Sequence, residues 1–200
     1  MAEWSKAGNV SSLQMINLSW SSLRAATLVS RMGMVNQAYP VQRQALEALV
    51  YSLLFRFDAS FHELWMNRHL DHKAKAKFRR EHWRRAISVI EEQDTKMSEA
   101  IVELHQTLID FGAHPNPISV GMMSEYRIDD GAEVGTVSYS MLLVQPYVDV
   151  AHVQTANVYL LLLDSLSLIW PDRMEIEDVL EKAGRARLYC LDLVRTFSST

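Results

Sequence analysis

The sequence predicts a mainly α-helical protein, a single domain over residues 1–200. The expected architecture is a bundle of about five to seven helices with one β-hairpin inserted near residues 118–144. Long stretches place apolar residues at three- and four-residue steps, as in helices that bury one face. Glycine and proline are sparse, at seven and five residues, and gather at a few breaks, which is typical of helices joined by short loops.

Three helices are expected in the first part of the chain. The first covers residues 10–37, and the Tyr-Pro pair at residues 39–40 is expected to end it and open the next, because proline suits a first helical turn. The second helix, residues 41–57, is apolar nearly all round and therefore belongs in the middle of the bundle. Asp58 is expected to cap a short third helix that runs to Leu70.

The rest of the chain alternates helical patterns with one β-prone segment. Residues 71–94 are basic and have a helical pattern, and residues 95–111 continue this helical pattern. The sequence does not decide whether the two segments form one bent helix or two helices. Between residues 118 and 144, Asp-Gly separates two β-prone runs, which predicts the hairpin. A long helix over residues 146–170 and an amphipathic helix over residues 173–196 complete the bundle.

Composition narrows the function classes. A formal charge of −4 gives no overall attraction to nucleic acid or to a membrane. The most apolar stretch, residues 158–170, is too short to span a bilayer and contains Asp164. The first residues lack a charged start followed by an apolar run, so no signal peptide is expected and a cytoplasmic location is predicted. The single cysteine, Cys190, excludes an intrachain disulfide, and we expect no metal and no cofactor.

A candidate binding site combines a charged pair with a loop. Glu47 lies in the apolar second helix, where a carboxylate costs several kcal/mol unless it is paired, and Arg43 is one turn away. The loop follows Gly112, which can adopt the left-handed conformation that closes a helix. Two readings remain open, a structural ion pair and a polar binding site. The predicted site consists of Arg43, Glu47, Asp110, His114 and Asn116.

The clearest charge feature is a basic run between Arg68 and Arg85. Eight basic residues face two acidic ones there, a local charge of +6, which leaves the remainder of the chain near −10. Such a run forms either a solvated helix face or a surface for phosphates and RNA. The candidate nucleic-acid contacts are Lys73, Lys75, Lys77, Arg79, Arg80 and Arg84.

The long helix over residues 146–170 carries polar side chains within one broad sector. This sector is either the solvent face of an amphipathic helix or a polar stripe that faces a cavity. Its members are Gln145, Asp149, His152, Asn157, Asp164 and Ser167.

Several short motifs together resemble a family. They are Y-P-x-x-R-x-x-L-E (residues 39–47), W-M-N-R-H (65–69), K-F-R (77–79) and I-D-F-G-A-H-P-N (109–116). In this order they resemble uncharacterised bacterial helical proteins that have no assigned activity. Arg56 and His62, separated by five residues, are similar to the pair in HEPN-type ribonucleases, which are helical bundles. That likeness implies RNA cleavage or defence against phage, with Arg56 and His62 as catalytic candidates. His114, in the loop after Gly112, is a further candidate for an acid or base.

Three functional hypotheses follow. The first is a non-enzymatic bacterial binding or regulatory module that forms a homodimer or binds a protein partner. The second is an RNA-binding protein or HEPN-like ribonuclease that uses the basic run, with histidine as acid or base. The third is a pocket for a small anion, where Arg43 would bind the anionic group. Whether the protein is an enzyme is left open.

Overall fold

The structure is a computed structural model that is mainly α-helical, as the sequence predicts. The described residues are 7–113, 117, 120–121, 124–128, 135–139, 143, 147–171 and 177–198.

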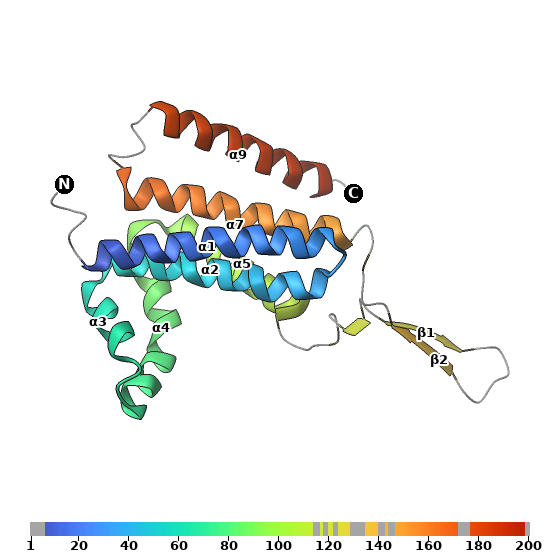
Figure 1. Cartoon of the computed structure of the whole chain (residues 1–200), viewed down its shortest axis with the longest axis horizontal. Helices are drawn as coiled ribbons and strands as arrows, with labels where there is room; N and C mark the ends of the chain where they lie inside the picture. The colour runs from blue at the N-terminus through green and yellow to red at the C-terminus, as the bar shows by residue number, and fades with distance from the viewer. Residues whose placement is uncertain are drawn as a thin grey trace.

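Four long helices form the body of the bundle (Figure 1). Helix α1 (Ala7–Arg31) runs antiparallel to α2 (Val35–Phe57), and α7 (Tyr147–Ile169) packs against both. Helix α9 (Glu177–Ser198) lies on the far side of α7 (Figure 1). None of the helices in the described ranges combines the length and hydropathy that a membrane crossing would require.

The remaining elements extend from this body or pack along it. Helices α3 (Ala59–Asn67) and α4 (His72–Gln93) project from one end, and α5 (Thr95–Leu108) returns along α2 and α7 (Figure 1). At the other end, strands β1 (Ser124–Ile128) and β2 (Gly135–Tyr139) pair antiparallel. Both strands lie inside the segment where the sequence predicts a hairpin. The Asp-Gly turn predicted between them is outside the described residues.

The break between α1 and α2 falls at Gly33, so the prediction that Tyr39-Pro40 marks this break is wrong. Gly33 has φ of 79°, its amide donates to the Ser30 carbonyl, and the amide of Met34 donates to the Val29 carbonyl. These two bonds are the Schellman arrangement that ends many helices. Pro40 lies inside α2 instead. As the sixth residue of α2, Pro40 lacks the N–H that would make an intrahelical bond, so it removes one bond of the helix and does not begin it.

Helix α2 occupies the centre of the bundle, as its apolar sequence predicts. It packs against α1, α7, α4 and α5, and most of its side chains are buried. Leu46, Leu49, Leu53 and Leu54 are fully buried. Burying a side chain of this size stabilises a fold by about 1.5–3 kcal/mol.

One polar residue of α2 is buried among these apolar side chains. Gln42 is fully buried, and its Nε2 donates to the Ala151 carbonyl at 2.8 Å and to Thr155 Oγ1 at 2.7 Å. Because an unpaired amide would cost about 1–3 kcal/mol, these two bonds make the register between α2 and α7 specific.

The segment after residue 71 forms two helices, which are divided at Asp94. This residue separates α4 from α5, and its Oδ1 accepts the amide of Met97 at 3.0 Å as an N-cap. Helix α5 then passes into a π-helical turn, η2 (Ile109–Ala113).

Gly112 adopts the positive φ that the sequence analysis expects of it, at 153°. A Cβ at this position would lie 3.2 Å from Tyr39 Cδ2, so the backbone of η2 packs closely on α2. The ring of Phe111 also contacts the ring of Tyr39, with centroids 5.6 Å apart. The chain therefore leaves the bundle one turn away from Arg43.

Candidate functional site

The exposed side of α4 carries a stripe of four basic side chains. Lys73, Lys77, Arg80 and Arg84 follow one another at steps of four, three and four residues, so they share one face of the helix, and all four are exposed. We call this stripe the basic surface. The buried side chain of Ala86 lies on the opposite face of α4. Lys75 and Arg79, the other predicted contacts, are also exposed but lie off the stripe.

The helix dipole affects only the first residue of this stripe. Helix α4 has no acidic residue in its first turn, and Lys73 lies there, whereas Asp71 directly precedes the helix and its carbonyl accepts the amide of Lys75. The start of a helix carries a partial positive charge whose effect is confined to the first turn, so Lys77, Arg80 and Arg84 lie beyond it. The attraction of the stripe for a polyanion therefore comes from the four side-chain charges.

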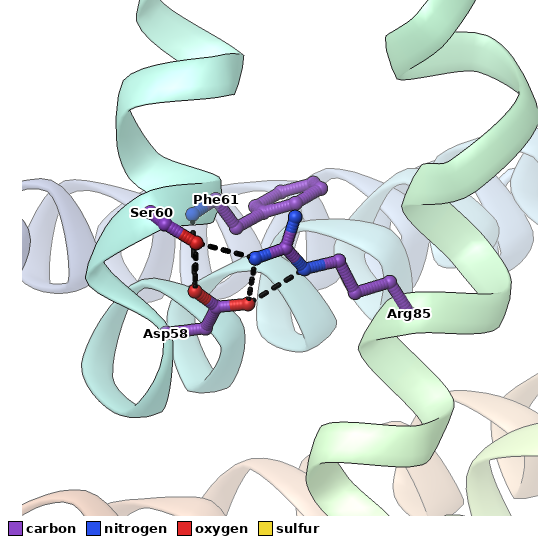
Figure 2. A network of polar contacts seen from close by, with 4 residues as sticks. All are labelled: Asp58, Ser60, Phe61 and Arg85. Carbon is purple, nitrogen blue, oxygen red and sulfur yellow. Dashed lines mark hydrogen bonds and ion pairs between the residues drawn. The ribbon is translucent and has the colours of Figure 1, made fainter.

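A polar network fixes α4 against the start of α3 (Figure 2). Arg85 donates from Nε to Asp58 Oδ2 at 2.6 Å and from Nη2 to Ser60 Oγ at 2.5 Å. Asp58 Oδ1 accepts the amide of Phe61 at 3.2 Å, which confirms the predicted cap of α3. The same carboxylate thus caps one helix and binds the next.

The pKa of Asp58 reflects this network. Burial alone would raise the pKa, but hydrogen bonds from Ser60, Arg85 and the Phe61 amide, together with the Arg85 charge, lower it below its usual value. Asp58 therefore stays ionised at neutral pH, and its contribution to stability is lost only as the pH falls through this lowered pKa.

Aromatic side chains also pack between α3 and α4. The guanidinium of Arg68 lies 4.2 Å from the ring centroid of Trp65, and its Nη1 donates to the Trp65 carbonyl at 3.1 Å. Phe78 stacks on His82 with centroids 5.0 Å apart and contacts Phe61 at 5.6 Å. Arg68 therefore has a packing role and is not counted in the basic surface.

The charged pair predicted in α2 is present, and it has a third member. Arg43 Nε donates to Glu47 Oε1 at 2.8 Å, and His105 Nε2 of α5 lies 3.6 Å from the same oxygen. The side chain of Glu47 is 35% exposed and that of His105 is 17% exposed. Trp83 of α4 stacks on the imidazole at 4.0 Å between centroids. We call these four residues the Glu47 cluster.

The environment of Glu47 keeps it ionised. Burial alone would raise its pKa, but hydrogen bonds and charge from His105 and Arg43 lower the pKa below the usual value of a glutamate. Arg43 is thus committed to Glu47, which favours the structural reading of this pair over a free anion site.

Sequence reasoning missed His105 and Trp83. His105 is four residues after the buried Ile101, so it continues the apolar stripe of α5. A histidine on such a stripe needs a partner, in the same way as Glu47 does. This signal was present in the sequence, but the pairing of the two residues depends on how α2 and α5 pack.

The loop part of the predicted site is only partly described. Asp110 accepts a hydrogen bond from Gln106 Nε2 at 2.8 Å. His114 and Asn116 lie outside the described residues. Of the five predicted residues, the structure brings Arg43 and Glu47 together, and a site that includes the loop stays a prediction.

The ribonuclease-like pair makes contacts with other helices. Arg56 Nε donates to the Ile169 carbonyl at the end of α7 at 3.1 Å, a favourable position for a cation. His62 Nε2 lies 2.8 Å from Ser11 Oγ of α1. These contacts join helices and add no support to a catalytic role for this pair.

Comparison with models of known protein families, with curated proteins and with solved structures finds no match to this chain. In the described part of the chain, no three His, Cys, Asp or Glu side chains group as a metal site requires.

The first prediction concerns the network that fixes α4. We expect Asp58→Ala to lower the free energy of unfolding by about 1–3 kcal/mol, because it removes both a cap and a charge-assisted hydrogen bond. Urea unfolding measures this loss. The matched control is Asp94→Ala, which removes only the cap of α5 and should cost about 1 kcal/mol. Equal losses in the two variants would show that the Arg85 contact contributes nothing.

The second prediction concerns the Glu47 cluster. A carboxyl whose pKa is lowered by folding stabilises the protein above the ordinary pKa and loses this contribution as the pH falls through the lowered value. We therefore expect Glu47→Gln to be less stable than the wild type at neutral pH and to lose less stability below about pH 5. Thermal unfolding across this range is the measurement. The control is Glu103→Gln, at an exposed position of α5. If Glu47→Gln lost as much stability as the wild type on lowering the pH below about 5, the prediction would be contradicted.

Proposed function

We propose that the protein is a bacterial binding module that contacts RNA through the basic surface of α4. The observation that carries the proposal is the single stripe formed by Lys73, Lys77, Arg80 and Arg84, all exposed and all opposite the packed face of the helix. A stripe of this kind contacts the phosphates of the RNA backbone and does not distinguish one base sequence from another.

The distribution of charge over the whole chain supports this surface. The run from Arg68 to Arg85 carries +6, whereas the chain as a whole carries −4. The remainder of the chain therefore carries a net negative charge, which favours binding of a polyanion at the α3–α4 projection (Figure 1). The projection also leaves the outer side of α4 away from α1, α7 and α9 (Figure 1).

The other hypotheses have less support. A small-anion pocket would require Arg43 to leave Glu47 or to bind a ligand beside it. A HEPN-like ribonuclease would require Arg56 and His62 to act together, although each contacts a different helix. Both remain alternatives to the proposed binding role.

Binding of a labelled single-stranded RNA, followed by fluorescence anisotropy over a salt series, tests the proposal. We expect the affinity to fall steeply with salt. Changing Lys73, Lys77, Arg80 and Arg84 to Gln should reduce the slope of log affinity against log salt by about 3, since each phosphate contact to a single strand contributes about 0.7.

The control carries the same change of charge elsewhere. It replaces four exposed basic residues by Gln: Arg24, Lys96, Lys182 and Arg185. This variant should bind as the wild type does. An equal loss in the control, or no binding at low salt, would refute the proposed surface. A gel of the same samples shows whether the RNA is cut, and cutting would favour the ribonuclease alternative.

A homodimer is proposed as well, with α1 at the interface. Leu28 and Met32 lie one turn apart on α1 and are 63% and 65% exposed. Neighbouring exposed apolar side chains are favourable where a second molecule covers them.

Sedimentation velocity tests this arrangement. The wild type should sediment as a dimer at micromolar concentrations, and Leu28→Lys with Met32→Lys should sediment as a monomer. The control is Val102→Lys, which changes an exposed apolar residue of α5 and should leave the dimer intact. A monomeric wild type would contradict the proposal.

A further inference from the structure

A cavity of about 520 Å³ is lined by residues of α1, α7 and α9. Helices α7 and α9 lie on the side of the bundle away from the projecting helices α3 and α4 (Figure 1). This volume is within the usual range of small-molecule sites. Most of its lining is apolar or aromatic. The residues that matter for its chemistry are Trp20, Arg31, His152, Tyr159, Leu163 and Ala186.

The cavity is elongated along the helices. At one point Trp20 of α1 meets Tyr159 of α7 edge to face, with ring centroids 5.4 Å apart. Eleven residues further along α1, Arg31 lies close enough to His152 of α7 to affect its ionisation. Eleven helical residues span about 16 Å, so an extended molecule fits between α1 and α7.

The two ends of the cavity differ in chemistry. Arg31 and His152 form a polar end. At the other end, Leu163 and Ala186 are apolar, and the ion pair between Arg187 and Asp164 shows that these residues of α7 and α9 are neighbours. The cavity is therefore amphipathic along its length.

The polar end holds one charged group that a ligand can contact. No carboxylate of the described residues pairs with Arg31, which is exposed. Nε2 of His152 is buried without a hydrogen-bond partner among the described residues. Because this nitrogen has no accessible surface, a ligand in the cavity contacts Arg31, and the charge of Arg31 favours a negatively charged head over an apolar one. Asp149 also lies near His152 and repels an anion, so a head with one negative charge is less unfavourable here than a head with two.

We propose that this cavity binds an elongated amphipathic monocarboxylate. Its carboxylate lies at Arg31, above His152, and its apolar tail runs past Trp20 and Tyr159 toward Leu163. Arginine binds a carboxylate through parallel N–H bonds, and the aromatic rings and Leu163 exclude water from the tail. The inference does not depend on RNA binding, since it uses none of the residues of α4.

Dodecanoate, dodecanol and dodecyltrimethylammonium are suitable probes, since they share a tail and differ in the charge of the head. Isothermal titration calorimetry below the micelle concentration of each probe should show dodecanoate binding at least tenfold tighter than either of the others. Equal affinity for dodecanoate and dodecanol, or no binding of dodecanoate, would overturn the proposal.

Two variants locate the ligand within the cavity. Arg31→Gln should weaken dodecanoate about tenfold and leave dodecanol unchanged, because it removes only the charged contact. Ala186→Trp should weaken both probes, because it fills the apolar end from an exposed position of α9. Arg185→Gln, an exposed arginine of α9 outside the cavity lining, is the matched control and should bind as the wild type does. Unchanged dodecanoate affinity in Arg31→Gln would assign the binding to another surface.

Discussion

The burial of α2 is the constraint on which the rest of this structure depends. A helix that is apolar on nearly all sides has to be covered on all of them, and here α1, α7, α4 and α5 provide the cover. The positions of the other helices follow from this requirement. The basic surface exists because one face of α4 packs toward α2 while the opposite face is left in water.

The polar residues of α2 show what can be predicted from the sequence and what cannot. Glu47 in an apolar helix needs a partner, and Arg43 was predicted from its spacing because residues four apart on a helix are neighbours. His105 was not predicted as a partner of Glu47, because this contact depends on how α5 packs against α2. Gln42 was not recognised either, since its partners on α7 are over one hundred residues away. Local geometry is visible in a sequence, and long-range pairing is not.

The helix boundaries also show which local features a sequence reveals. The caps at Asp58 and Asp94 are local, and the first was predicted from its neighbours. The end of α1 was placed wrongly because Pro40 is the more conspicuous residue, yet Gly33 supplies the positive φ that a Schellman turn needs. Pro40 is the sixth residue of α2, so a proline does not mark a helix boundary by itself. A glycine followed by a new apolar pattern was the better signal.

Two features of this molecule leave basic groups for a ligand to bind. Lys73, Lys77, Arg80 and Arg84 lie together on the exposed face of α4, and Arg31 lies at one end of the cavity between α1, α7 and α9. Like charges three and four residues apart on a helix repel one another, so the stripe on α4 is unfavourable until an anion binds it. Binding sites commonly reduce the stability of the free protein in this way, because the groups that bind a ligand are left unsatisfied without it. The two features lie on different sides of α2, so each points to its own ligand, a polyanion on α4 and a single carboxylate between α1 and α7.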